Sequence, residues 1–420
     1  MVLSPEATAT VRATLPVIGA AIDDIAARFY DTMFADNPEL LRNLFNRGNQ
    51  ANGEQRAALA GSIAAYASSL VNGAGVPHAM LARIANKHAS LGVTSDQYTV
   101  VQRYLFGAIA HVLGDAATPD VVRAWDEVYW LMAGTLIAME AVMYSESEQG
   151  WLPATVVDRR QEAPDTVSFT LRPPSPGAFR PGQYISVAVP LADGARQIRQ
   201  YSLSSAPGRD HWRITVKRVS GGGPDGEVSS MLHASVRPGD VLSVSAPFGD
   251  LVLPPGDGPL LLASAGIGVT PILSMLGHLA ATGSTRRVVV VHADRAPAHH
   301  AHREELHDLV AALPGATLHR WYEDTDGCSC ACAEPALGER VEAAVPAAGG
   351  STGRASAQVV PVRVGRADLS EIELPEGLTA CLCGPVPFMR EARAQLIARG
   401  VPASDIHYEV FGPDLWLGRD

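Results

Sequence analysis

The chain has 420 residues, of which 47% are hydrophobic and 18% are charged. At about 150 residues per domain this length predicts two to four domains, and the composition excludes a chain that is disordered throughout. Acidic residues outnumber basic residues by 44 to 33, for a formal net charge of −11. Because such a surface repels phosphates, we expect no nucleic-acid partner.

The apolar stretches predict a cytoplasmic protein without an obligate membrane partner. The first 16 residues lack a basic stretch followed by an apolar run, so no secretory signal is expected. The uncharged stretch 258–277 contains Pro259 and Pro271, which favour a buried strand and turn over a membrane helix. The five cysteines are an odd number, which favours free thiols over a disulfide framework.

The first domain, 1–148, is predicted to be all-α. Helix starts combine a capping residue, a proline and an acid, as in Ser4-Pro5-Glu6 and Asn37-Pro38-Glu39. Thr94 and Gln97 have the spacing of a capping box. We expect helices at about 5–21, 22–36, 38–45, 53–72, 77–88, 95–114 and 119–148.

Two domains of different character follow. Over 151–257, short β-branched runs between Pro and Gly clusters predict an antiparallel β-barrel, with strands at about 155–157, 166–171, 184–189, 213–218 and 241–245. Over 258–420, apolar strands alternate with helical segments, which predicts an α/β domain around a parallel sheet, with strands at 260–263, 288–291 and 380–382. An inserted, partly disordered loop is expected at about 324–357.

One histidine stands out in the helical domain. In the helix predicted at 77–88, His88 shares a face with the apolar residues Leu81, Ile84 and Ala85, so it points into an apolar interior. A histidine in that position is either a core residue with satisfied hydrogen bonds or a metal ligand.

Several runs around it carry a resemblance. The runs 37–40, 44–46, 52–56 and 85–88 are similar to the globin domain of bacterial flavohaemoglobins. The resemblance implies that His88 is the proximal haem ligand and that Tyr30 and Gln55 form the distal polar pair over bound O₂. It also implies that Phe45 packs on the porphyrin and that Leu59 forms the distal apolar wall.

The same resemblance joins the proximal histidine to Tyr98 and Glu140 and includes Lys87 in a matched run. A carboxylate partner makes the imidazole a stronger donor to iron and favours activating O₂ over carrying it. Without the resemblance, Glu140 would suit a solvated helix position and Lys87 an exposed surface position.

The predicted barrel carries a second resemblance, to the flavin site of the ferredoxin-reductase-like superfamily. The run Arg180-Pro181-Gly182-Gln183-Tyr184 precedes the run 199–202 and the run 226–229. There an aromatic ring stacks on the flavin, while arginine, hydroxyl and backbone amides neutralise the pyrophosphate. The implied FAD-binding residues are Tyr184, Arg199, Gln200, Tyr201, Ser202, Gly226, Val228 and Ser229. The alternative is an ordinary alternating strand, and Lys217 suits an exposed strand position.

Three runs of the third domain resemble the nicotinamide side of the same superfamily. A glycine loop lies between a strand and a helix, where it permits close backbone approach and directs the helix N-terminus at phosphate. Its residues are Gly266, Ile267, Gly268, Val269, Thr270 and Pro271. The run Cys383, Gly384 and Pro385 matches the nicotinamide motif, and the run Glu409, Val410, Phe411, Gly412 and Pro413 matches the flavin-facing C-terminal segment. In the family, the aromatic residue matched by Phe411 lies against the flavin until nicotinamide displaces it.

Other features are less diagnostic. Cys328, Cys330 and Cys332 lie in the predicted insertion and match zinc-site spacing poorly. The run His299-His300-Ala301-His302 suits a solvated helix start better than a metal site. After strand 288–291, Asp294 would accept from a ribose 2′-hydroxyl and Arg295 would pair with a 2′-phosphate, and together they favour NADH with appreciable NADPH use.

These resemblances together imply an NAD(P)H-dependent nitric oxide dioxygenase that converts NO and O₂ to nitrate. The cofactors would be haem b, FAD and NADH or NADPH, with electrons passing in the order NAD(P)H, FAD, haem, and we expect a monomer. Two alternatives stay open. One is a haem O₂ or NO carrier or sensor whose flavin module keeps its own iron reduced. The other is a reductase of flavins, ferric iron or peroxides in which the globin domain is incidental.

Overall fold

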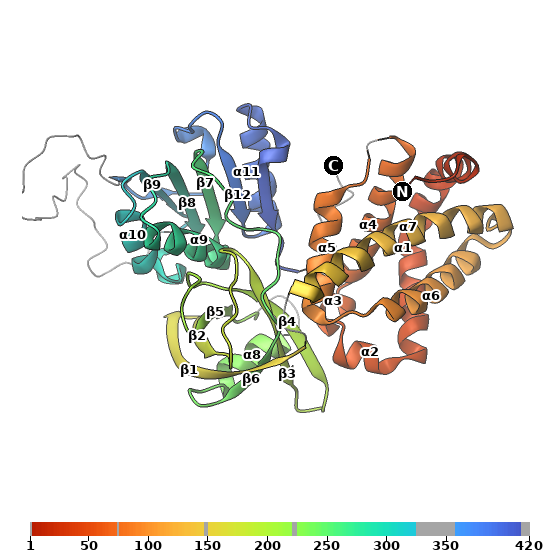
Figure 1. Cartoon of the computed structure of the whole chain (residues 1–420), viewed down its shortest axis with the longest axis horizontal. Coiled ribbons are helices and arrows are strands. Elements are labelled where there is room, and N and C mark those ends of the chain that lie inside the picture. The colour runs from red at the N-terminus through yellow and green to blue at the C-terminus, as the bar shows by residue number, and fades with distance from the viewer. Residues whose placement is uncertain (1, 74, 147–149, 221–224, 325–357, 413–420) are drawn as a thin grey trace, which may run out of the picture.

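The computed structural model describes residues 2–73, 75–146, 150–220, 225–324 and 358–412. It contains a helical domain, then an antiparallel sheet, then a parallel sheet with helices. In Figure 1 the helical domain lies to one side, and the two sheet domains are stacked on the other. The predicted fold class is therefore confirmed. The insertion's three cysteines and Pro413 lie outside the described residues.

The helices of the first domain begin and end at other residues than predicted. A single helix of 32 residues replaces the two helices expected at 5–21 and 22–36. Its buried side chains, including Ile18 and Ile25, continue across the expected break, so packing holds it as one helix despite Pro16. The short helix at 47–51 was not predicted, because five residues give no periodic pattern. The helices are α1 (Pro5–Asp36), α2 (Pro38–Asn43), α3 (Arg47–Ala51), α4 (Glu54–Val71), α5 (His78–Leu91), α6 (Ser95–Leu113), η1 (Gly114–Ala116) and α7 (Pro119–Glu146).

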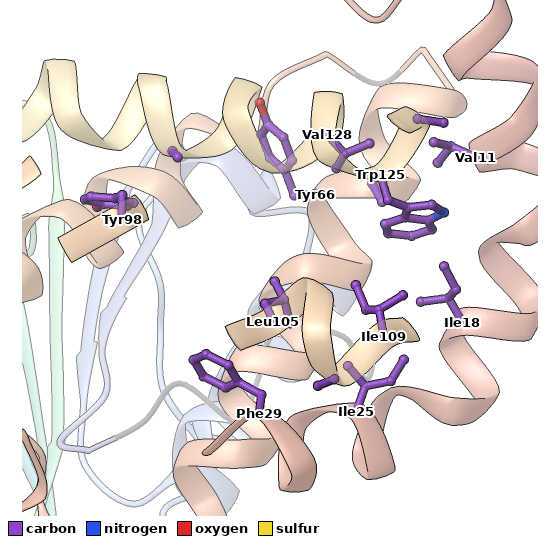
Figure 2. Packing of buried hydrophobic residues seen from close by; sticks show 14 of the residues in the cluster. Val11, Ile18, Ile25, Phe29, Tyr66, Tyr98, Leu105, Ile109, Trp125 and Val128 are labelled. Atoms are coloured by element: carbon purple, nitrogen blue, oxygen red, sulfur yellow. The ribbon is translucent and has the colours of Figure 1, made fainter. Parts of the chain in front are cut away.

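The core of this domain forms where α1, α6 and α7 meet. Figure 2 shows Ile18 and Ile25 of α1 facing Ile109 of α6, with Trp125 of α7 closing the cluster. The seven-residue spacing of the α1 pair places both side chains on one helix face. The capping box of Thr94 and Gln97 is present, as predicted.

Helix α7 is long and apolar enough to cross a membrane if only length and composition are considered. Its side chains nevertheless build the core of the helical domain: Val121, Trp125, Val128 and Leu136 are buried there. Glu140 is buried on the same helix and is 2% exposed. We therefore interpret α7 as a core helix of this domain.

The second domain is a closed antiparallel sheet. Its six strands follow the order β4-β3-β6-β1-β2-β5, and a bridge between Leu203 and Ile214 joins the two ends of that order. One helix, α8, packs Val228 and Leu232 into the interior. The elements are β1 (Leu152–Ala163), β2 (Thr166–Arg172), β3 (Tyr184–Pro190), β4 (Arg196–Ser202), β5 (Trp212–Lys217), α8 (Glu227–Ser235) and β6 (Val241–Val244).

The third domain is a parallel sheet in the order β10-β9-β8-β7-β12-β13, with β11 also paired to β9. Parallel pairing of β7 with both β8 and β12 brings their carboxyl ends to one edge. The elements are β7 (Leu260–Ala265), η2 (Gly266–Gly268), α9 (Val269–Ala281), β8 (Val288–Asp294), η3 (Pro297–His299), α10 (Arg303–Ala311), β9 (Ala316–Tyr322), β10 (Gln358–Val359), β11 (Arg363–Val364), η4 (Leu369–Glu371), β12 (Thr379–Cys383), α11 (Val386–Ala398), η5 (Ala403–Asp405) and β13 (Ile406–Glu409).

Candidate functional site

Three helices bring His88, Tyr98 and Glu140 together. Nδ1 of His88 on α5 lies 2.9 Å from the Tyr98 hydroxyl and 3.0 Å from Oε1 of Glu140. The Tyr98 hydroxyl donates to the same carboxylate oxygen at 2.6 Å. Burial, together with the Glu140 charge, raises the pKa of Tyr98 well above its ordinary value. The phenol therefore stays protonated and remains a donor to Glu140.

This arrangement assigns the imidazole proton. Because Nδ1 faces a carboxylate oxygen, the proton sits on Nδ1, and Nε2 keeps its lone pair. The His88 side chain is 32% exposed, whereas that of Glu140 is 3% exposed. No residue in the described part of the chain hydrogen-bonds to Nε2. The geometry thus fits a histidine that donates from Nδ1 and offers Nε2 to a haem iron.

Tyr30, on α1, is the centre of the polar group expected on the distal side. It is buried, and burial raises its pKa well above the ordinary value, while hydrogen bonds with Gln55 and Gln50 lower the pKa only in part. Phe45 lies edge-on to it, with 5.9 Å between ring centroids. Leu59 packs against the same core. The structure thus brings Tyr30, Gln55 and Phe45 together, and it places Leu59 against the core of the same domain.

Gln50 was not predicted. Its side-chain nitrogen and oxygen are both buried and, Tyr30 aside, have no hydrogen-bond partner among the described residues. It lies on the unpredicted helix α3, five residues before Gln55. A buried amide with open hydrogen-bonding capacity suits a pocket that takes a small polar ligand. The only signal in the sequence was a second glutamine close to the first.

The predicted flavin ring site lies at the border of the helical and barrel domains. Tyr184 at the start of β3 is buried in a cluster with Ala89 of α5 and Phe248. Burial, followed by the charges of Glu409 and Asp250, raises the pKa of Tyr184 well above its ordinary value. Gly249 has φ of 122°, and a Cβ there would lie only 3.0 Å from the Tyr184 ring, a tight contact. This neutral ring, held in place, suits stacking on a flavin.

On β4, the run 199–202 provides polar groups for the rest of the cofactor. Burial lowers the pKa of the Arg199 guanidinium, so an anion bound beside it would stabilise this cation. Ser202 has a buried hydroxyl with no hydrogen-bond partner among the described residues, which is the state expected of a group that binds a ligand. The Tyr201 phenol is also neutral because burial raises its pKa. Gln200 instead donates to the Ser186 hydroxyl at 3.1 Å.

The N-terminus of α8 follows the run 226–229. A side chain at Gly226 would collide with the Ser229 hydroxyl and with Val219, so the tight turn requires glycine. Ser229 itself is engaged locally, because it donates to the Gly226 carbonyl at 3.1 Å and accepts from the Val219 amide at 3.2 Å. The Val228 side chain belongs to the barrel core, so only its backbone can face a phosphate.

The two predicted nicotinamide motifs meet at the sheet edge. The register of β7 and β12 pairs Ser264 with Cys383, so the loop 266–271 and the run 383–385 lie side by side. A side chain at Gly268 would collide with the Cys383 carbonyl, and Gly266 has φ of 53°. Gly268 is therefore required by the close backbone approach, and Gly266 by its left-handed backbone conformation. Thr270 donates to the Ile267 carbonyl and closes the turn into α9.

The C-terminal segment lies beside these motifs. Strand β13 pairs Glu409 with Cys383, and burial, then the Glu409 charge, raises the pKa of that thiol well above its ordinary value. Val410 is buried, whereas Phe411 is 45% exposed. An exposed aromatic ring next to a nicotinamide motif suits a residue that covers a flavin and moves aside when nicotinamide binds.

The loop after β8 has an unexpected arrangement. The Arg295 guanidinium is 3.3 Å from Oδ2 of Asp165 in the barrel domain. The Asp294 carboxylate accepts from the Arg295 backbone amide at 2.7 Å, and its Oδ2 has no hydrogen-bond partner among the described residues. Burial opposes ionisation of Asp294, but the neighbouring His292, whose Nε2 lies 3.7 Å from that Oδ2, lowers the pKa of Asp294 below its ordinary value. The loop after β8 therefore carries a buried acceptor, Oδ2 of Asp294, while the Arg295 guanidinium pairs with Asp165 of the barrel domain.

The prediction of a solvated helix start at 299–302 was wrong for two of its three histidines. His300 is 3% exposed and bonds to the Tyr322 hydroxyl at 2.8 Å, and His302 is 5% exposed and bonds to Thr215 at 2.9 Å. They are buried because the helix begins only at Arg303, so the preceding turn packs inward. Within the described ranges, no three His, Cys, Asp or Glu residues are grouped to hold a metal ion.

Three protein families match successive parts of the chain. Globin matches residues 27–136, the oxidoreductase FAD-binding domain matches residues 153–252, and the oxidoreductase NAD-binding domain matches residues 262–331.

Whole-length relatives have the same organisation. A flavohemoprotein of Chromobacterium violaceum is 39% identical over 98% of both chains, and one of Bordetella pertussis is also 39% identical over 98% of both. The crystal structure of a flavohemoglobin from Malassezia yamatoensis, with bound FAD and heme, matches 98% of this chain and 100% of its own, at 35% identity and a TM-score of 0.83. The FAD/NAD-binding domain of a nitric oxide dioxygenase from Vibrio cholerae matches 63% of this chain and 100% of its own, at 32% identity and a TM-score of 0.51.

Proposed function

The chain belongs to the flavohemoprotein family of oxidoreductases, with a globin, an FAD-binding and an NAD-binding domain, and on this premise we propose that it is a nitric oxide dioxygenase. It would use NAD(P)H to convert NO and O₂ to nitrate and so remove NO. The observation that carries the proposal is the hydrogen-bonded group of His88, Tyr98 and Glu140 in a chain that also contains its own reductase domains. An oxygen carrier needs no such strongly donating ligand.

The described residues fit three cofactors. His88 would bind the haem iron, with Phe45 and Leu59 against the porphyrin. Tyr184, the run 199–202 and the N-terminus of α8 would hold FAD, and the loop 266–271 would hold the nicotinamide nucleotide. When bound, haem supplies O₂ activation, FAD converts a two-electron donor into single electrons, and the nicotinamide supplies the reducing equivalents.

On the proximal side, the protein tunes the ligand. Glu140 accepts from Nδ1 of His88 at 3.0 Å and from Tyr98 at 2.6 Å, so the carboxylate is fixed by two donors. A buried carboxylate on Nδ1 increases electron density on Nε2, which strengthens the push of the ligand toward iron.

On the distal side, the protein provides a neutral donor. Because burial raises the pKa of Tyr30, its hydroxyl stays protonated across the physiological range and can donate to a charge-bearing diatomic ligand. Gln55 and Gln50 lie beside that hydroxyl. The Phe45 ring lies edge-on to the Tyr30 ring.

We also propose NADH as the preferred donor, with NADPH accepted. Asp294 is an ionised carboxylate with an open oxygen, which can accept from a ribose 2′-hydroxyl and repels a 2′-phosphate. Arg295, which would pair with that phosphate, is bound instead to Asp165.

The proposal takes NO and O₂ as the substrates of a cytoplasmic monomer that has neither a nucleic-acid partner nor an obligate membrane partner. Its test is the absorption spectrum of the purified chain before and after NADH under air, followed by NO with nitrate as the measured product. A carrier or sensor would bind the gas without NADH-driven turnover. A simple flavin, iron or peroxide reductase would keep its main activity after removal of residues 1–147.

A further inference from the structure

Gln197 of β4 reaches from the barrel domain into the helical domain. It is fully buried, with 0% exposure. Its Nε2 donates to the carbonyls of Leu41, Arg42 and Phe45 at 3.2, 3.0 and 3.2 Å. These carbonyls belong to the chain corner that links α2 to α3 and carries the Phe45 ring. The two N–H groups of one side chain thus serve three backbone carbonyls at this corner.

The oxygen of the same amide faces the flavin site. Oε1 of Gln197 accepts from Nη1 of Arg199 at 3.2 Å and from the Arg47 backbone amide at 3.4 Å. Arg199 is a partly buried cation in the predicted cradle for the FAD pyrophosphate. The Gln197 amide therefore contacts a predicted FAD-binding residue with its oxygen and the haem-facing corner with its nitrogen.

A second set of contacts ties the corner to the same cradle. The Arg47 guanidinium binds Asp193 at 2.6 Å and Glu227 at 2.8 Å. Glu227 lies in the first turn of α8, whose N-terminus is the other part of the predicted pyrophosphate site. Asn43 accepts from the Arg196 amide at 3.2 Å. The corner is thus held from several points, but among these residues only Gln197 contacts both its carbonyls and Arg199.

We propose that Gln197 is a positioning residue that couples occupancy of the FAD site to the placement of the corner 41–47, and through Phe45 to the haem. This inference rests on the cofactors assigned under the proposed function. A pyrophosphate beside Arg199 would hold its guanidinium in place. The guanidinium would in turn hold the Gln197 amide, whose nitrogen donates to the three carbonyls of the corner. When FAD leaves, the guanidinium loses the anion beside it, so its contact with the Gln197 oxygen is no longer fixed and the corner loses this anchor. Coupling of this kind is reciprocal, so haem also strengthens FAD binding.

The first test uses the wild-type full chain and needs no substitution. Hydrogen exchange is followed in holoprotein and in protein depleted of FAD by dialysis. Removal of FAD should speed amide exchange in 41–47 by about fivefold or more. Exchange in the corner 114–118, which lies between α6 and α7, should not change. Equal exchange of 41–47 in both forms would overturn the coupling. Wild-type protein without flavin or haem absorbance would instead contradict the proposed function.

The second test replaces the amide by an apolar side chain of similar length, Gln197→Met. The matched control is Gln161→Met, because Gln161 donates to the carbonyls of Ala163, Pro164 and Thr166 at a hairpin in the same domain, away from the corner. In Gln197→Met, the corner should exchange fast with FAD present, and re-addition of FAD to depleted protein should no longer shift the haem spectrum. Electron transfer from FAD to haem should slow by about fivefold or more, while reduction of FAD by NADH stays unchanged. If both variants behave like wild type, or if both lose the haem response equally, Gln197 has no coupling role.

Discussion

Lys87 donates a 2.9 Å hydrogen bond from Nζ to the carbonyl of Gly412, which lies 325 residues further along the chain. Lys87 precedes the proposed haem ligand on α5, and Gly412 follows Phe411 in the segment predicted to face the flavin. Asn86 on the same helix accepts from the Gly249 amide at 2.7 Å, beside Tyr184. The helix that carries His88 is therefore fixed directly to both walls of the proposed flavin site, which is the arrangement needed for short-range electron transfer.

Replacing Lys87 tests this contact. Lys87→Met should slow electron transfer from FAD to haem by about tenfold, because small errors in orientation are costly. Reduction of FAD by NADH should be unaffected, since the proposed flavin and nicotinamide sites lie in the other two domains. Stopped-flow absorbance separates the two steps. Lys217→Met is the control because it changes the chain's other lysine, which pairs with Asp165 instead; equal slowing in both variants would count against the Lys87 contact.

His88→Ala should abolish stable haem binding and leave FAD binding and NADH-dependent flavin reduction intact. The reason is that His88 supplies the iron ligand, whereas the flavin and nicotinamide sites lie in the other two domains. Haem and flavin contents follow from the absorption spectrum and from cofactor extraction. A normal haem spectrum in this variant would remove His88 as the ligand.

Tyr30→Phe should raise the dissociation rate of O₂. One hydrogen bond to a charge-bearing ligand contributes ~1.5–3 kcal/mol, which corresponds to a rate increase of roughly ten- to a hundredfold. Flash photolysis or rapid mixing with CO measures the rate. Because the phenol pKa is raised well above its ordinary value, the wild-type rate should not change across the physiological pH range. An unchanged dissociation rate in the variant would exclude this donor role.

Glu140→Gln should slow NO turnover by about tenfold or more while changing O₂ affinity little. Glu140 bonds to Nδ1 of His88 and so tunes the iron ligand, but it does not contact the bound gas. Tyr98→Phe should act in the same direction, since it removes one of the two donors that fix the carboxylate. NO consumption under NADH and equilibrium O₂ binding are the two readouts. Equal loss in both would indicate a merely structural role.

Asp294→Asn should raise kcat/KM for NADPH relative to NADH by about tenfold, equivalent to ~1.4 kcal/mol, because it removes a charge that repels a 2′-phosphate. Arg295→Ala should change the ratio by less than about twofold, since its guanidinium pairs with Asp165 of the barrel domain and that exposed pair contributes little. Steady-state kinetics with both donors decides. A selective loss of NADPH efficiency in Arg295→Ala would show that the arginine reads the phosphate after all.

The sequence by itself determined the fold class and the order of the domains. Those features rest on local signals: helical periodicity before 148, alternation and turn residues after 150, and apolar strands after 258. Contiguous runs also sufficed for the haem-side and flavin-side candidates, because residues such as His88 and Glu409 lie inside recognisable motifs. The continuous helix α1 and the short helix α3 were misjudged, because tertiary packing sets the first and too few residues mark the second.

Only the tertiary structure decided which residues meet across long separations. Gln197 and Phe45 lie 152 residues apart, and Lys87 and Gly412 lie 325 apart, so no local pattern could join them. Gln50 became a pocket residue only when α3 placed its amide beside Tyr30. His300 and His302 became buried only when the turn before α10 packed against the barrel and β9. Burial and hydrogen-bond partners are set by the packing of distant segments, and that packing is what a linear sequence of residues does not display.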